Sequence, residues 1–458
     1  MRRLSLSLAM AAAPVVALAL QGGCSSSHDI PLPGEDAGAK SEGSVPSNEA
    51  GSDGSGGSFG DTTLESGVET GAGDDASDAS PHEAAAEAGA ETGSADAPEG
   101  DAPPPSTDAG STAGEVWVLR VGASGASSAP TTLATAVFLD RFLVAGGTPH
   151  GTIALPVAAN GADQPLTLSG SADSEGALNR TGDGKYVLLA GYAAAPGAGD
   201  THADGAVTGI ADTATSGTAG VPRVVGRVDA SGAVDTSFTT TAYSTNDIRG
   251  AASTDASVYW MFGDGSGSSG GISYQAASAG AAILVSTGAG TVRIGSVFGG
   301  RVYGSSATGT IRGVFTMTDA LPTVAEPAAV LPGFPTTTGP SPYAFAALAL
   351  GGSAALDTIY LCDDRASASG GGLQRWKLAA GTWTLAATLN DSMTSGCRGV
   401  AATATLTGVT LLVTTSETTG NHLLELVDTT AGLATITATD LADAPPNTVF
   451  RGVALAPN

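Results

Sequence analysis

Four arginines share one position of a motif that recurs along the C-terminal part of this sequence. The clearest copies are residues 248–252, 397–401 and 450–454, which read IRGAA, CRGVA and FRGVA. Three looser copies bring the total to six. The residues at the shared position are Glu175, Arg249, Arg293, Tyr343, Arg398 and Arg451. Guanidinium groups that converge from several repeats offer fork-shaped N–H donors, which suit a carboxylate, sulfate or phosphate. Glu175 would add a hydrogen-bond acceptor and Tyr343 a stacking face, so the six form a candidate binding site.

The same pattern also fits a structural role. An arginine at a repeated strand start can bind carbonyl or Asp oxygens of the neighbouring repeat and fix its geometry. The glycine that follows Arg249, Arg398 and Arg451 agrees with this role, because glycine lets two backbones pack closely. The two roles are compatible, and the sequence leaves both open.

Residues for catalysis or metal binding are sparse in the same part of the chain. Its histidines are His150, His202 and His422, each in polar sequence, and none has metal-ligand spacing to another. Residues 265–270 fit Gly-x-Gly-x-x-Gly, but a strand is predicted over 271–277, where a nucleotide-binding loop requires a helix. We therefore interpret this segment as a hairpin loop, and we predict no cofactor and no metal ion.

The adjacent acids Asp363 and Asp364 follow a predicted strand and could supply one catalytic carboxylate. Glycoside hydrolysis needs a second carboxylate that faces the first, and the sequence identifies none. We interpret the pair as solvated turn residues. The sequence thus favours a binding protein over an enzyme without excluding catalysis.

The elements that must position the repeated residues are short strands. Strand-like runs occur at 116–121, 135–142, 186–192, 258–262, 358–362, 373–378, 409–414 and 422–427, separated by Gly or Asp-Gly turns. No stretch shows helical periodicity. Regular short strands with such turns predict an all-β sandwich, barrel or propeller. We also expect Trp117, Trp260, Trp376 and Trp383 to lie in the core.

The spacing of the motif favours a β-propeller. After a first interval of 74 residues, widened by a polar loop at 193–220, the copies follow one another at 44 to 55 residues. This is the spacing of four-stranded blades. The last copy is a single strand at 448–457, and its missing partners lie at 116–121, 135–142 and 151–157. We predict six four-stranded blades, closed by pairing of the N- and C-terminal strands. Seven blades are the alternative, if the long first interval contains two.

Residues 115–458 as a whole resemble a family of uncharacterised exported bacterial lipoproteins with a β-propeller-like repeat domain. The likeness lies in the arginine motif and in residues 225–229 (VGRVD), 331–335 (LPGFP) and 450–457 (FRGVALAP). The resemblance implies the propeller architecture and no activity.

The N-terminus has the features of an export signal. Arg2 and Arg3 precede an apolar run over 4–20, and small residues lead to Cys24. This segment resembles the lipobox of bacterial lipoproteins, although Gln21 takes the place of the usual aliphatic residue. The resemblance implies a signal peptide at 1–23, lipid on Cys24 and, from Ser25, delivery to the outer membrane. The alternative is an ordinary secretory signal beside a thiol.

A change in composition marks residues 24–114 as a tether. Ser, Gly, Ala, Pro and acidic residues dominate, with nineteen Asp and Glu against Lys40 as the one basic residue. Such a segment cannot bury enough apolar surface to order itself, so we predict a disordered linker. It carries most of the formal charge of −26. The acidic balance and the lack of a basic stripe argue against nucleic acid as a partner.

Two cysteines, Cys362 and Cys397, remain after lipidation of Cys24. In an oxidising compartment such a pair forms either a disulfide or two buried thiols, and the sequence leaves both open.

The leading hypothesis is an envelope-displayed lipoprotein whose propeller binds an anionic small molecule, a polysaccharide or a surface protein at the mouth of its central channel. One alternative is an envelope hydrolase or lyase that acts on a glycan or lactone at the same mouth. Another is a structural surface-layer component with no specific small ligand.

Overall fold

The computed structural model describes residues 114–202, 204–265, 270–278, 280–390, 393–429 and 438–458. The predicted signal peptide, Cys24 and the predicted tether up to residue 113 lie outside the described residues. No helix of the described residues is long and apolar enough to span a membrane.

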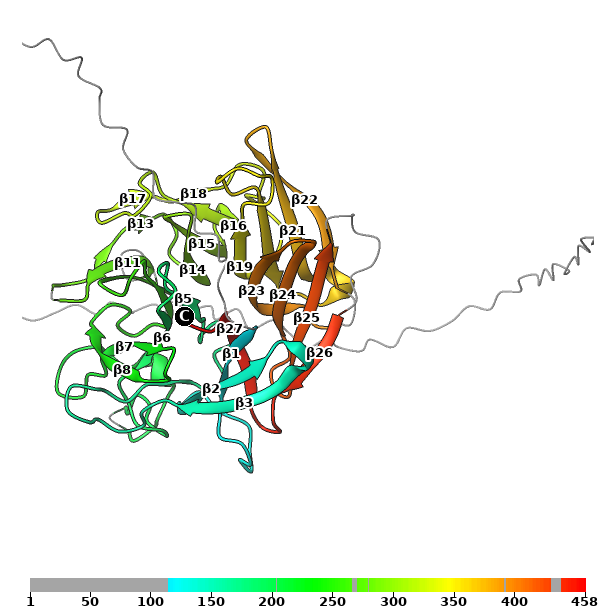
Figure 1. The fold of residues 1–458 in the computed structure, drawn as a ribbon. Helices are drawn as coiled ribbons and strands as arrows, with labels where there is room; N and C mark the ends of the chain where they lie inside the picture. Colours follow the sequence, from blue (N-terminus) through cyan, green and yellow to red (C-terminus); the bar gives the residue numbers. More distant parts are fainter. Residues whose placement is uncertain (1–113, 203, 266–269, 279, 391–392, 430–437) are drawn as a thin grey trace, which may run out of the picture. The chain divides into compact units, whose positions relative to one another are not determined.

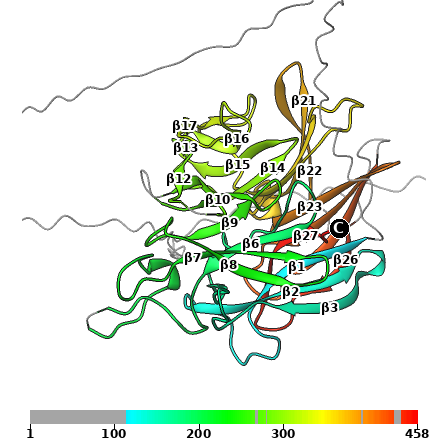
Figure 2. The same ribbon diagram turned by 60° about the vertical axis from the view of Figure 1, so that its left-hand side comes forward.

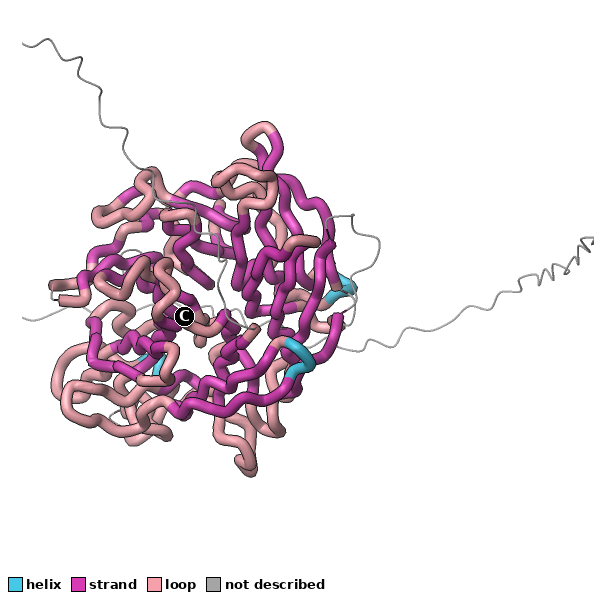
Figure 3. The backbone as a smooth tube through the Cα atoms, in the orientation of Figure 1, coloured by secondary structure: helices cyan, strands magenta, loops and turns pink. Residues whose placement is uncertain are grey.

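The described residues form β-sheets, almost all of them antiparallel, with strands throughout (Figure 3) and no α-helix among them. Three 3-10 helices occur there, η1 (Ala145–Gly147), η2 (Ile210–Asp212) and η3 (Ser367–Ser369). The all-β fold predicted from the turn-separated apolar runs is confirmed, and several strands match closely. The predicted strand 186–192 is β6 (Tyr186–Tyr192), and the motif at 248–252 is β9 (Ile248–Ala252).

The strands group into six four-stranded blades (Figure 1). From its inner to its outer strand, blade one consists of β27 (Val449–Leu455), β1 (Glu115–Val121), β2 (Ala134–Leu143) and β3 (Thr148–Ala154). In the same order, blade two consists of β5 (Asn179–Arg180), β6, β7 (Arg223–Asp229) and β8 (Val234–Thr240). Blade three consists of β9, β10 (Val258–Gly263), β11 (Gly271–Ala276) and β12 (Ile283–Leu284).

Blade four consists of β14 (Ile294–Phe298), β15 (Arg301–Thr308), β16 (Ile311–Thr316) and β18 (Ala329–Val330). Blade five consists of β19 (Pro342–Leu348), β20 (Thr358–Asp363), β21 (Gly372–Ala379) and β22 (Thr382–Leu389). Blade six consists of β23 (Cys397–Thr405), β24 (Gly408–Thr415), β25 (His422–Thr429) and β26 (Ala438–Asp443).

Three short strands lie outside this scheme. Strand β4 (Thr167–Ser169) pairs with β2 and β6 and so links blades one and two. Strands β13 (Ser286–Thr287) and β17 (Glu326–Pro327) pair in parallel outside the blades. None of the three was predicted from the sequence, because two or three residues carry no periodicity.

The C-terminal strand β27 pairs with β1, as the sequence predicts. Val116 lies opposite Leu455 and Val121 opposite Val449, so strands from both ends of the described chain share one blade. Figures 1 and 2 both show β27 beside β1. The innermost strands contact one another in the order β5, β9, β14, β19, β23 and β27, and β27 contacts β5.

The hydrophobic core lies between neighbouring blades. Trp117 packs with residues of blades one and two, and Trp260, Trp376 and Trp383 pack in a cluster that spans blades three to five. All four tryptophans are buried, as predicted. Alternate residues of each strand face the two neighbouring blades, because successive side chains point to opposite faces of a sheet.

In blades one and six, the glycine of the repeated motif lies where backbones of two blades meet. A Cβ added at Gly452 would lie 2.4 Å from the carbonyl oxygen of Gly176, and one at Gly399 would lie 2.6 Å from the carbonyl oxygen of Arg451. A side chain at either position would push the inner strands apart.

Covalent and ionic links join blades five and six. A disulfide connects Cys362 of β20 to Cys397 of β23, whose Cα atoms are 5.1 Å apart. Further out, Nη1 of Arg375 on β21 donates to both carboxylate oxygens of Asp428 on β25, at 3.0 and 2.7 Å. The hydroxyl of Tyr360 donates to the same carboxylate at 2.5 Å.

Candidate channel-mouth site

The repeated position lies at or beside the inner strand of every blade except the short β5, which it precedes. Arg249, Tyr343 and Arg398 are the second residues of β9, β19 and β23, and Arg451 is the third of β27. Arg293 directly precedes β14, and Glu175 lies four residues before β5.

Four of the six predicted site residues line one cavity. Glu175, Tyr343, Arg398 and Arg451 border it, together with Asp173 and backbone of the inner strands. The volume that the centre of a water molecule can occupy in it is about 20 Å³, so the cavity holds little more than one water. Arg249 and Arg293 are not among its lining residues.

Arg398 lies between two carboxylates and an aromatic ring. Its Nη2 atom is 3.1 Å from Asp173 and 3.5 Å from Asp364. Its guanidinium carbon lies 5.4 Å from the centroid of the Tyr343 ring, and that of Arg293 lies 4.4 Å from the same centroid. Tyr343 is only 5% exposed, and the guanidinium groups of Arg293 and Arg398 lie beside its ring.

Glu175 is a buried acceptor. The backbone N–H of Ser169 donates to its Oε2 at 2.8 Å, and the hydroxyl of Tyr192 donates to its Oε1 at 2.5 Å. Burial, reinforced by the nearby charge of Asp247, raises the pKa of Glu175 to about 8 despite the opposing charge of Arg451. Burial thus favours the uncharged, protonated form of this carboxyl.

Arg451 is buried with unused donors. Its Nη2 donates to the carbonyl oxygen of Gly170 at 2.8 Å, but its Nε and Nη1 have no hydrogen-bond partner. Burial lowers the pKa of this guanidinium, although Glu175 and Asp173 oppose the shift. The Nε of Arg398, on the same cavity, is also buried without a partner. Buried donors of this kind are rare in folded proteins, because each unmet group costs free energy.

Arg249 holds blade three to its neighbour. Its Nη1 donates to the carbonyl oxygen of Val292 at 3.2 Å, and its Nη2 lies 3.4 Å from both Asp247 and Asp264. This arrangement is the structural role that the sequence left open for the repeated arginines.

The aspartates beside these arginines were not predicted from the sequence. All four lie outside the strands. Asp173 and Asp247 each lie two residues before a repeated position, but the other four copies have no acid there, and Asp264 and Asp364 each directly follow the second strand of a blade. They neutralise much of the positive charge expected at the mouth.

The interpretation of Asp363 and Asp364 as solvated turn residues is wrong. Asp363 is fully buried at the end of β20, where Arg365 pairs with it at 2.6 Å and the amide of Gln374 donates to it at 2.9 Å. Asp364 faces Arg398 instead of open solvent. The strand after the Gly-x-Gly-x-x-Gly segment is β11, which pairs with β10 as a hairpin, and residues 266–269 lie outside the described residues.

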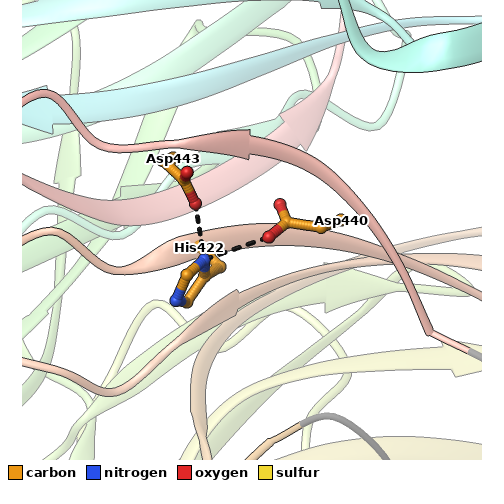
Figure 4. Close-up of side chains that lie close together, drawn as sticks. All are labelled: His422, Asp440 and Asp443. Carbon is orange, nitrogen blue, oxygen red and sulfur yellow. Dashed lines mark hydrogen bonds and ion pairs between the residues drawn. The ribbon is translucent and has the colours of Figure 1, made fainter.

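A second polar cluster lies on blade six, where His422 meets Asp440 and Asp443 (Figure 4). The Nδ1 atom of His422 is 3.1 Å from Asp440 and 2.6 Å from Asp443. The histidine was singled out in the sequence, but its partners are 18 and 21 residues away and come together only through the pairing of β25 with β26.

Comparison with known proteins identifies no family. No protein-family model matches the chain, and no curated protein sequence matches it. Among solved structures, the dihydro-heme d1 dehydrogenase NirN in complex with DHE is similar at 10% identity and a TM-score of 0.36, over 70% of this chain and 53% of that one. The chain thus spans about half the length of NirN. Apo AztD from Citrobacter koseri is similar at 10% identity and a TM-score of 0.28, over 71% and 70% of the two chains.

Proposed function

We propose that residues 115–458 form a binding or scaffolding domain, and that its ligand presents an anionic oxygen to the cavity lined by Glu175, Tyr343, Arg398 and Arg451. The observation that carries the proposal is the pair of unpartnered N–H groups on Arg451, which is 4% exposed and borders the cavity. An oxygen acceptor that reaches these groups regains hydrogen bonds that the free protein lacks.

The cavity and its charges restrict the ligand. With room for little more than a water, it admits the tip of one carboxylate, sulfate or phosphate group and leaves the rest of the ligand outside. Asp173 and Asp364 already pair with Arg398, so net positive charge contributes little attraction. A ligand that also offers hydroxyl donors to these carboxylates fits better, and an acidic sugar or the end of an acidic polysaccharide has both groups.

The geometry does not favour the alternative of an envelope hydrolase or lyase. Asp173 and Glu175 border the same cavity, but both oxygens of Glu175 accept hydrogen bonds from the protein, and the side chain is buried. A general acid must reach the atom that it protonates. The mouth therefore supports binding better than acid–base chemistry.

We further propose that this domain is displayed on the cell envelope, anchored in the outer membrane by lipid on Cys24 and spaced from it by the tether. Support comes from the charged, apolar and small-residue order of residues 1–24. Incorporation of labelled palmitate into the wild type but not into Cys24→Ala would support the anchor, and equal labelling would exclude it.

The binding site is tested by calorimetric titration of the protein with glucuronate, citrate, sulfate and phosphate. At least one probe is expected to bind with one site per chain. Arg451→Lys keeps the charge but loses the fork of donors and should weaken binding about tenfold or more. Arg312→Lys is the matched control, because Arg312 also has a buried, unpartnered Nε but does not line the cavity. Absence of binding by every probe, or equal binding by Arg451→Lys, would overturn the proposal.

A further inference from the structure

We propose that His422, Asp440 and Asp443 bind a divalent transition-metal ion such as Zn²⁺ at the outer edge of blade six. The site is separate from the channel mouth and independent of the function proposed for it. One imidazole nitrogen and two carboxylates from two adjacent strands form the cluster (Figure 4).

A β-bulge brings the three side chains to one face of the sheet. His422 lies directly opposite Asp443 in the pairing of β25 with β26. A regular register would place Leu441 opposite Leu424, but the register shifts and Asp440 takes that place. Because residues two apart on a strand share a face, the shift moves Asp440 to the face of His422. Leu441 and Ala442 instead pack on the apolar cluster between blades six and one.

Blade one supports the bulge from the other side. Gly147, at the end of η1, packs against the backbone of Leu441 so closely that an added Cβ would lie 2.2 Å from the carbonyl oxygen of that residue. Gly147 also has a φ of +60°, which favours glycine. Asp440 and Asp443 flank residues 441 and 442, so their position is fixed by packing between blades as well as by the hairpin.

The donor atoms suit a transition metal. The three ligand atoms lie within 4.8 Å of one another. Metal–ligand bonds of about 2.1 Å in a tetrahedral site require ligand atoms about 3.4 Å apart. The Nδ1 of His422 is 3.1 Å from Asp440 and 2.6 Å from Asp443, so small side-chain rotations suffice. Imidazole nitrogen favours Zn²⁺ and its neighbours in the periodic table over Ca²⁺ and Mg²⁺, which prefer oxygen. Three protein ligands leave the fourth position to water or to a group of another molecule.

A further carboxylate lies beside the cluster. Glu417 interacts electrostatically with His422, and its Oε2 atom is buried without a hydrogen-bond partner. Glu417 is half-buried, and Thr415 and Ser395 stabilise its negative charge, to which a cation at the cluster would add a further favourable interaction. Glu417 thus adds an observation that favours a cation at this edge of blade six, independent of the three ligands.

Calorimetric titration with Zn²⁺ tests the proposal on the chelator-treated protein at pH 7.5. The wild type is expected to bind one Zn²⁺ that His422→Gln and Asp443→Asn bind at least tenfold more weakly. The three ligand side chains are 39%, 51% and 69% exposed, so both variants should fold, with a melting temperature without metal equal to that of the wild type. Zn²⁺ should then raise the melting temperature of the wild type more than that of either variant.

His150→Gln is the matched control, because the Nδ1 of His150 lies 3.0 Å from a Glu115 carboxylate on an exposed surface. It should bind Zn²⁺ as the wild type does. Equal Zn²⁺ affinity in the wild type and His422→Gln, or an equal loss in His150→Gln, would refute the site. Displacement of Zn²⁺ by equimolar Ca²⁺ would overturn the assignment to a transition metal.

Discussion

The ion pair of Arg375 with Asp428 offers a direct test of what holds blades five and six together. Its side chains are 14% and 4% exposed, and the carboxylate accepts hydrogen bonds from Arg375 and Tyr360. Arg375→Met removes the charge that compensates a buried carboxylate while keeping most of the apolar stem. Breaking a buried pair in this way costs about 3–5 kcal/mol.

Arg227 and Asp235 provide the matched control. They pair at 2.7 Å, but their side chains are 36% and 37% exposed. Because water screens an exposed pair, Arg227→Met should cost about 1 kcal/mol or less. Equilibrium urea unfolding, followed by tryptophan fluorescence, measures both free energies of unfolding.

A second substitution separates charge from packing. Asp428→Asn keeps an oxygen acceptor for Tyr360 and removes the charge. It should destabilise the wild type, since Arg375 then lacks its counter-ion, and should stabilise the Arg375→Met variant, since no unpaired carboxylate remains. If Asp428→Asn destabilises both backgrounds equally, the buried charge is not what makes the pair important, and the reasoning fails.

Two further predictions concern the buried carboxyl of Glu175 and the motif glycine. The pKa of Glu175 is raised from 4.5 to about 8 in the fold, so its contribution to stability is complete below pH 4.5 and is lost as pH rises through 8. Between pH 5 and pH 8 the free energy of unfolding of the wild type in urea should therefore fall by at least about 1.4 kcal/mol more than that of Glu175→Gln. The same pH dependence of unfolding in both proteins would contradict this. Gly452→Ala should cost about 1–3 kcal/mol because its Cβ meets backbone. Gly209→Ala is the control, because Gly209 has a φ of −64° and an added Cβ would meet only side-chain atoms of Asp212 and Thr132 within 3.4 Å. This variant should change the free energy of unfolding by less than about 1 kcal/mol. Equal losses in the two variants would refute the packing argument.

Much of the fold follows from local patterns. Runs such as 186–192 and 248–252 become strands because they are short, mostly apolar segments bounded by turn residues, and each pattern is short enough to read from the sequence alone. The motif spacing also placed Arg249, Arg398 and Arg451 on inner strands, because each blade repeats the same length of chain.

The partners of these residues were not predictable in the same way. Asp173 reaches Arg398 from a loop more than 200 residues earlier, and nothing local connects the two. The cluster at His422 depends on a one-residue bulge at Leu441, which shows only in the pairing of two strands. Such contacts depend on how the blades pack against one another, and the periodicity of the sequence does not reveal that packing.

The pairing of β27 with β1 also sets the order in which the domain can assemble. As the chain is synthesised, strands β1 to β3 emerge first, yet the inner partner of β1 is residues 449–455. Until residues 449–455 are synthesised, the edge of blade one at β1 is unpaired, and an unpaired strand edge can pair with strands of other chains. Contacts between distant segments also form slowly. A chain cut before residue 449 would keep five of its inner strands and still lack the innermost strand of its first blade.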